Sequence, residues 1–201
     1  MKILVVGGNG TIGKAVVKEL SGRHTVMIAG REHGDVRVDI TDEKSIKAMY
    51  QSIGKLDAVI ATTGSAQFAP LVEMTAERYH VGLQSKLMGQ VSLVLIGFNY
   101  LSGNGSFTLT SGILNYDPIR SATSSAMVNG ALEGFVKSAA IDMPQHMRIN
   151  IVSPTVLTES IEGYGDSFRG FVPVPAAQVA LAYSKSVEGA QTGQVYRVGY
   201  G

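Results

Sequence analysis

Short apolar runs alternate with segments of helical spacing along the whole chain. The runs 3–6 and 58–61 contain only aliphatic residues, so both faces of the strands that they predict must be covered. Strands of this kind are typical of a parallel sheet between two layers of helices. The predicted strands are Lys2–Val6, His24–Ala29, Val36–Val38, Ala58–Ala61, Ser106–Thr110, Arg148–Val152 and Gln194–Val198.

The predicted helices fill the intervals between these strands. They are Ile12–Leu20, Asp42–Ile53, a long helix from Thr75 to about Leu101, one from about Ser121 to Asp142, and Pro175–Ser186. Because crossovers between parallel strands are right-handed, we predict an α/β fold: a single domain over 1–201 with a doubly wound, seven-stranded parallel sheet and helices on both faces. The longest irregular stretch, 163–175, is rich in glycine, proline and aromatic residues, and we expect it to form a lid on the substrate side.

Composition excludes several classes of site. Of the 201 residues 45% are hydrophobic and 16% charged, which suits a compact core. A net charge of +1 without a basic block argues against nucleic acid or an anionic membrane as partner. The chain has no cysteine and its four histidines are scattered, so we expect no disulfide and no metal site. Since the apolar run 91–98 is too short to cross a bilayer and a strand begins at Lys2, we expect a cytoplasmic protein without a leader.

The glycine pattern of residues 5–13 carries the clearest chemical signal. The segment reads Val-Val-Gly-Gly-Asn-Gly-Thr-Ile-Gly and joins the first predicted strand to the first predicted helix. Such a turn lets backbone N–H groups approach a pyrophosphate at the positive end of the helix. We therefore predict a dinucleotide site here; the alternative is a tight turn with a purely structural role.

Further motifs follow the glycine turn in an order known from one protein family. They are Ala29-Gly30-Arg31, Asp39-Ile40-Thr41, Thr62-Thr63-Gly64, Thr110-Ser111-Gly112, Arg148–Pro154 and Thr192-Gly193-Gln194. With these motifs the chain resembles the short-chain dehydrogenase/reductase family over essentially its full length. The resemblance implies a Rossmann fold that binds NAD(P).

The resemblance also implies which residues hold the cofactor. An arginine after the second strand, where NAD-binding members carry an acidic residue, implies that Arg31 binds the ribose 2′-phosphate and that NADP(H) is preferred over NAD(H). The implied cofactor-binding residues are Gly7, Asn9, Gly10, Thr11, Ile12, Gly13, Arg31, Asp39, Ile40, Thr62, Thr63, Gly64, Pro154 and Thr158.

The chain departs from the family at the catalytic Tyr-x-x-x-Lys pair. When Gly130–Phe135 is matched to the segment that follows this lysine, Ser125 stands in place of the tyrosine and Asn129 in place of the lysine. A serine hydroxyl is a far weaker acid than a phenol, and an amide supplies no cation to lower a pKa. The family's usual proton relay is therefore expected to be absent.

Three other side chains are candidates for the missing chemistry. Lys86, three residues before Gly89, stands where the family has an asparagine, so Lys86 and Asn129 would have exchanged helices and would meet in the floor of the pocket, directly or through one water. The alternative places Lys86 on a solvated or subunit-facing surface. Ser111 would bind a substrate oxygen or only end its strand. Tyr116 would bring a phenol into the site or serve in packing.

These residues support two functional hypotheses. The first is an NADP(H)-binding oxidoreductase of this family with a non-standard active site, acting on a small carbonyl compound or alcohol. The second is a non-catalytic NADP(H)-binding sensor or regulatory protein. In either case the family usually pairs through its central helices, and the small and apolar residues of 88–91 and 126–131 predict a homodimer or homotetramer.

Overall fold

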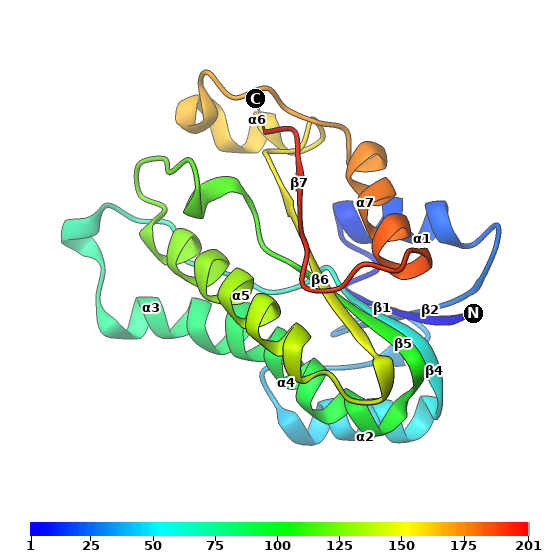
Figure 1. Ribbon diagram of the computed structural model, residues 1–201. Helices are drawn as coiled ribbons and strands as arrows, with labels where there is room; N and C mark the ends of the chain where they lie inside the picture. Colours follow the sequence, from blue (N-terminus) through cyan, green and yellow to red (C-terminus); the bar gives the residue numbers. More distant parts are fainter. Residues whose placement is uncertain (201) are drawn as a thin grey trace.

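One parallel sheet of seven strands lies at the centre of the protein (Figure 1). The computed structural model describes residues 1–200. Its strands, in sequence order, are β1 (Lys2–Val6), β2 (Thr25–Gly30), β3 (Val36–Arg37), β4 (Leu56–Ala61), β5 (Leu101–Thr110), β6 (Arg148–Pro154) and β7 (Val195–Val198). In the sheet they lie side by side in the order β3-β2-β1-β4-β5-β6-β7. All neighbouring strands are parallel, so the predicted fold class is confirmed.

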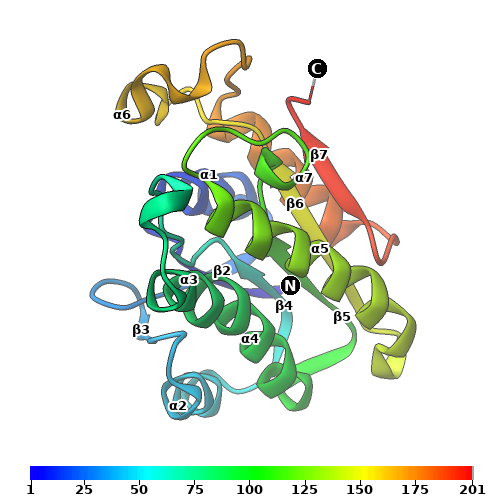
Figure 2. The ribbon, with the colours of Figure 1, turned by 90° about the vertical axis from the view of Figure 1, so that its left-hand side faces the viewer.

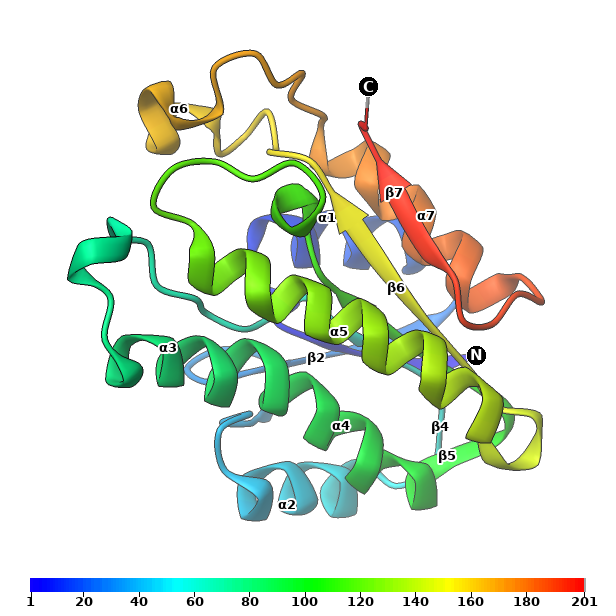
Figure 3. The same cartoon turned by 60° about the vertical axis from the view of Figure 1, so that its left-hand side comes forward.

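Helices cover both faces of the sheet. One layer contains α2 (Glu43–Ile53), α3 (Ala76–Gly82), α4 (Gly89–Gly97) and α5 (Thr123–Asp142), which Figure 2 shows in front of the sheet. The opposite layer contains α1 (Thr11–Leu20) and α7 (Ala176–Glu188), packed against each other. The short helix α6 (Ile161–Tyr164) lies above the carboxyl ends of the strands, beyond the arrowheads of β6 and β7 in Figure 3.

The two layers divide the hydrophobic core in two. Along β1, Leu4 and Val6 pack toward α2, α4 and α5, whereas Ile3 and Val5 pack toward α1 and α7. Each of these four side chains is at most 1% exposed. The alternation follows from the two-residue period of a strand, and burial on both sides explains why the run is continuously apolar.

The predicted long helix is one helical stretch that is not regular. Between α3 and α4 the backbone forms the π-helical segment η2 (Leu83–Met88), and the 3₁₀ turn η3 (Phe98–Tyr100) follows α4. In a π-helical segment each backbone hydrogen bond spans one residue more than in the α-helix, and such segments are frequent at functional sites. By length and composition alone Ala76–Tyr100 could cross a membrane, and 44% of its most apolar window is buried in the fold.

Several predicted boundaries move because hydrogen bonds, not hydropathy, set them. The side chain of Asp42 accepts a hydrogen bond from the backbone N–H of Lys44, so Asp42 caps α2 and the helix begins at Glu43. β5 begins at Leu101 and β6 continues to Pro154, because pairing with neighbouring strands extends both beyond their apolar cores. Helical turns of three or four residues, such as η4 (Ile113–Asn115) and η6 (Gly165–Phe168), are too short for a periodic signal and were not predicted.

Gly64, three residues beyond β4, lies directly against η2. Its φ is +116°, and a Cβ there would lie 2.6 Å from the Cα of Lys86. Because the left-handed backbone and the steric clash both oppose a side chain, Gly64→Ala is expected to lower the free energy of unfolding by about 2 kcal/mol or more. Urea denaturation measures the loss. Gly22→Ala, at a position where a Cβ meets nothing within 4 Å, is the control. Equal stabilities of the two variants would contradict the close approach.

Candidate functional site

Two cavities lie side by side at the carboxyl ends of the strands. The first, of about 390 Å³, extends from the start of α1 to α6, and the second, of about 300 Å³, lies beside the end of β2. Gly64 and Ser65 line both cavities, so the loop after β4 separates them. The carboxyl edge of a doubly wound sheet is the place where such folds bind ligands.

The glycine turn between β1 and α1 leaves room for a group held by backbone N–H donors. Gly7 has a φ of +86°, and a Cβ on it would lie 2.7 Å from the carbonyl oxygen of Thr62. A Cβ on Gly13 would lie 2.7 Å from the Cα of Gly8. The helix α1 starts after Gly10 with no side-chain cap and no acidic residue in its first turn. Its N-terminal N–H groups therefore fit an anion such as a pyrophosphate.

Arg31 lines the smaller cavity together with Gly7, Ile40 and Thr63. One guanidinium nitrogen of Arg31 lies 3.5 Å from a carboxylate oxygen of Asp39. The same oxygen accepts hydrogen bonds from the hydroxyl and the N–H of Thr41, which lower the pKa of Asp39. Both partners of the ion pair are largely exposed, so the pair is weak and the guanidinium remains available to an anionic ligand.

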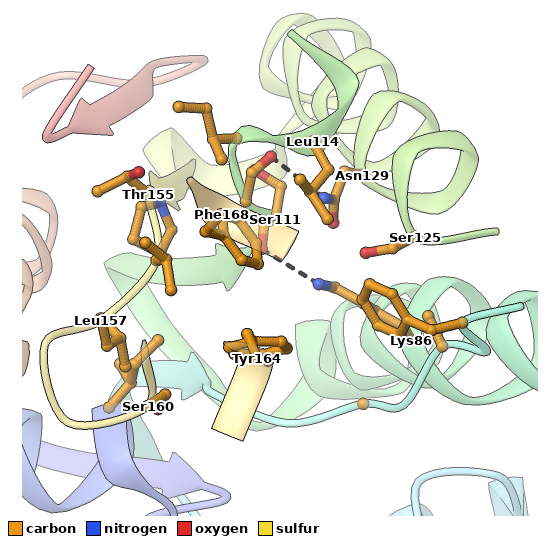
Figure 4. Close-up of a pocket in the computed structure, with 18 of the residues that line it drawn as sticks. Lys86, Ser111, Leu114, Ser125, Asn129, Thr155, Leu157, Ser160, Tyr164 and Phe168 are labelled. Carbon is orange, nitrogen blue, oxygen red and sulfur yellow. Dashed lines mark hydrogen bonds between the residues drawn. The ribbon is translucent and has the colours of Figure 1, made fainter. Parts of the chain in front are cut away.

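A buried glutamine fixes Lys86 opposite Ser111. The side-chain amide of Gln90 donates to the carbonyl of Thr110 at 2.9 Å and accepts from the N–H of Thr110 at 2.8 Å. These two bonds join the long helical stretch to the end of β5. As a result the ammonium of Lys86, one turn before Gln90, points into the larger cavity and donates to the carbonyl oxygen of Ser111 at 3.2 Å (Figure 4).

Ser125 and Asn129 of α5 line the same cavity as Lys86. Figure 4 shows the three side chains on one side of the cavity, so Lys86 is not turned away from Asn129. The amide nitrogen of Asn129 donates to the carbonyl of Gly112 at 3.1 Å. Its buried amide oxygen has no hydrogen-bond partner among residues 1–200. An unpaired acceptor in the wall of a cavity that also holds an ammonium is suited to a bridging water or a ligand donor.

Lys86 bears the only charged side chain among the residues of the described chain that line this cavity. Burial lowers its pKa from the usual 10.5 to about 8. No carboxylate of residues 1–200 forms an ion pair with it. An ammonium that is desolvated without a counter-charge is costly to hold and strongly attracts a developing negative charge.

The hydroxyl of Ser111 points to a buried carboxylate. Ser111 Oγ donates to Glu133 Oε1 at 3.2 Å, and Glu133, on α5, is only 5% exposed. Ser111 also lines the cavity, so its lone pairs can accept from a ligand there. The role of Glu133 was missed from the sequence. It stands one turn after Asn129 on the same face of α5, and that spacing was the available signal.

Aromatic side chains from two loops cover the larger cavity. Tyr164 of α6 and Phe168 of η6 are in edge contact, with ring centroids 5.1 Å apart. Phe68, from the loop after β4, approaches Tyr164 with centroids 6.4 Å apart. All three line the cavity, and two of them belong to the segment 163–175 for which we predict a lid. That the segment opens and closes stays a prediction.

Other predicted site residues lie outside both linings. Tyr116 is 68% exposed, and its ring lies against Tyr200 rather than in the cavity. Thr158 is exposed and bonds through its N–H to Val174, and Asn9 donates to the carbonyl of His33. The lining of the larger cavity includes Ile12, Ser111, Pro154 and Lys86. Within residues 1–200, no cluster of three or more histidine and acidic side chains could hold a metal ion.

Comparisons with known proteins show a family match and similar solved structures. Residues 8–192 match a family model described as enoyl-(acyl carrier protein) reductase. The crystal structure of the protein lin1944 from Listeria innocua is 54% identical, covers 98% of either chain and superposes with a TM-score of 0.97. A small-chain dehydrogenase solved in complex with NADPH is 28% identical over 98% of this chain and 96% of its own, with a TM-score of 0.88.

Curated relatives are more distant. A hydroxynaphthalene reductase from Aspergillus fumigatus is 23% identical over 175 residues, which are 75% of this chain. The aligned region spans only 64% of that reductase.

The buried charge of Lys86 is expected to lower the free energy of unfolding, although the same charge attracts a developing negative charge in the cavity. Because the pKa of Lys86 is lower in the folded protein, the charged form costs stability below pH 8, and stability is regained as the pH rises from about 8 to 10.5. Without nucleotide, Lys86→Met should therefore raise the free energy of unfolding at pH 7 by about 1–3 kcal/mol, and by less at pH 10. Urea denaturation at both pH values measures the gain. The exposed Lys137→Met is the control, and a loss of stability at pH 7 would contradict the burial of a charge.

Proposed function

The chain belongs to the short-chain dehydrogenase/reductase family, and from this we propose that it is an NADP(H)-dependent oxidoreductase acting on a small carbonyl compound or the corresponding alcohol. The nicotinamide cofactor supplies or accepts the hydride when it is bound. The protein's own residues bind it, orient the substrate oxygen and move one proton. The NADPH complex of a related dehydrogenase supports the choice of nucleotide.

We assign the pyrophosphate to the glycine turn and the start of α1. The ribose 2′-phosphate would be bound by Arg31, since the neighbouring Gly30 has no carboxylate to repel it. Ile12 and Pro154 then border the larger cavity, where the nicotinamide and the substrate would meet.

The ammonium of Lys86 is the observation that carries the proposal. We propose that Ser125 and Asn129 replace the family's tyrosine and lysine, and that Lys86 supplies the missing cation from the opposite helix. Placed 3.2 Å from the carbonyl of Ser111 and without a carboxylate partner in residues 1–200, it can stabilise negative charge on a substrate oxygen during hydride transfer. The hydroxyl of Ser111 stands beside that oxygen and exchanges the proton.

The decisive experiment follows NADPH oxidation with a panel of small aldehydes and ketones, alongside a fluorescence titration of NADPH binding. We expect turnover that declines as the pH rises through about 8, because the charged form of Lys86 is the useful one. Lys86→Met should reduce kcat at least about tenfold while Lys137→Met leaves it unchanged. Tight NADPH binding without turnover would instead favour a non-catalytic sensor or regulatory protein.

Cofactor choice is tested at Arg31. The unmodified protein should bind NADPH more tightly than NADH by about 1.5–3 kcal/mol, the range for hydrogen bonds to a charged group. Arg31→Ala should lose most of this preference, while Arg37→Ala, an exposed arginine of β3 outside the cavity lining, should keep it. Equal affinities of the unmodified protein for the two nucleotides would refute the assignment.

Assembly is tested on the outer face of α4 and α5. Leu95, Phe98, Phe135, Ala139 and Met143 line a groove of about 480 Å³ there, and Leu95 is 53% exposed. Of the predicted interface residues 88–91 only Met88 is exposed, because Gly89, Gln90 and Val91 are buried in the core. We therefore propose that a homodimer or homotetramer buries this groove instead. In light scattering, Leu95→Glu should shift the mass toward the monomer, whereas Val72→Glu, on the 94% exposed Val72 of another surface, should not. A monomer mass for the unmodified protein at micromolar concentration would overturn the expectation.

A further inference from the structure

A continuous chain of hydrogen bonds leads from the larger cavity toward the surface at the end of β7. Ser111 Oγ bonds to Glu133 Oε1 at 3.2 Å, and Ser153 Oγ bonds to the same oxygen at 3.1 Å. Ser153 Oγ in turn lies 2.7 Å from the hydroxyl of Tyr200. Ser111 lines the cavity and Tyr200 is partly exposed, so the four groups join two environments.

The surroundings of Glu133 make it unusual for a carboxyl in a core. Its side chain is 7% exposed, and its second oxygen lies 4.0 Å from a guanidinium nitrogen of Arg197, which is 46% exposed. The guanidinium also stands over the rings of Tyr116 and Tyr200, 5.8 Å from each centroid. A buried carboxyl is rarely retained without a partner or a role, and here the neighbouring hydroxyls and the cation all face it.

Donor and acceptor capacities fix the direction of each bond. A carboxylate only accepts, so Ser111 and Ser153 both donate to Glu133. Ser153 has then used its only proton, and it accepts from the phenol of Tyr200. Burial raises the pKa of Tyr200, so the phenol is protonated at neutral pH and donates the hydrogen bond to Ser153. Every bond in the chain is thus of a type along which a proton can move.

We propose that Ser111, Glu133, Ser153 and Tyr200 conduct the reaction's proton between the cavity and solvent, in place of the family's tyrosine–lysine relay. The inference rests on the proposed oxidoreductase function. Ser111 is the only one of the four that touches the substrate; Glu133, Ser153 and Tyr200 act through it.

The proton balance is complete in both directions. In oxidation, the nicotinamide cofactor would accept the substrate C–H hydrogen as a hydride with both electrons, and the substrate hydroxyl proton passes to Ser111 Oγ as the Ser111 proton passes to Glu133. The hydroxyls of Ser153 and Tyr200, which in the structure donate toward Glu133, then rotate outward. Protonated Glu133 donates to Ser153, Ser153 to Tyr200, and Tyr200 releases one proton to solvent. Reduction runs the same transfers backwards. In the structure the Ser111–Glu133 bond has the direction that oxidation requires, whereas the bonds from Tyr200 to Ser153 and from Ser153 to Glu133 have the direction that reduction requires.

Isosteric substitutions separate conduction from a purely structural role. Glu133→Gln keeps the size and most hydrogen bonds but cannot take up a proton, and Tyr200→Phe removes one hydroxyl and keeps the ring on Tyr116. Tyr196→Phe is the matched control, since the Tyr196 hydroxyl bonds to Gln191 outside the chain of four. The measurements are kcat with NADPH and the fastest carbonyl of the panel, its solvent deuterium isotope effect, the NADPH dissociation constant and urea denaturation.

Glu133→Gln should lower kcat by about a hundredfold, and Tyr200→Phe by about tenfold with a larger solvent isotope effect. Both should bind NADPH within twofold of the unmodified protein, and Tyr196→Phe should match it throughout. If Glu133→Gln does not fold, Ser153→Ala and Tyr200→Phe decide. Turnover and isotope effects unchanged in the variants would overturn the relay and leave the proposed function standing. No turnover by the unmodified protein, with NADPH bound, would overturn both.

Discussion

The site depends on one buried amide that joins helix to sheet. Gln90 is fully buried, and both ends of its side chain bond to the backbone of Thr110, as a neighbouring strand would. If Gln90 were displaced, the backbone N–H and carbonyl of Thr110 would lose their partner in the core. The free-energy cost of these unsatisfied groups fixes the position of the helix along β5. Lys86 lies one helical turn before Gln90, and Ser111 is the residue after Thr110. Their separation is therefore set by the core and does not depend on a flexible loop.

Buried polar residues gather at particular places in this fold. One buried polar cluster, of Thr108, Asn150 and Ser186, lies along the middle of β5 and β6, whereas β1 is a continuous aliphatic run between two helical layers. At the carboxyl ends the buried polar residues include Ser111, Ser125, Asn129 and Glu133, and the half-buried Lys86 lies beside them. Groups of this kind weaken a fold unless each finds a partner. Asn129 retains an unpaired oxygen and Lys86 an uncompensated charge, so stability has been given up where a ligand can restore it.

The sequence was sufficient for the architecture and for part of the site. The five-residue strand Lys2–Val6 was predicted with correct bounds, because burial on both faces leaves a plain signal, whereas at least one end of every other strand lies elsewhere than predicted. The placement of Lys86 and Asn129 in one cavity also agrees with the motif register. The connection of Ser111 to Glu133 and Tyr200 could not be read from the chain. Ser111 follows β5, Glu133 is on α5 and Tyr200 follows β7, and only the completed sheet brings them together.

The position of Tyr200 has a practical consequence for anyone who produces the protein. Tyr200, two residues after β7, is hydrogen-bonded to Ser153 in the interior, whereas Lys2 begins β1 at the amino ends of the strands, away from the cavities. Purification tags, fluorescent fusions and immobilisation linkers attached behind Tyr200 would pull on the residue that closes the hydrogen-bond chain. The same attachments ahead of Met1 act at the amino ends of the strands, away from the cavities. An inactive preparation that carries a fusion directly behind Tyr200 therefore says little about the unmodified protein.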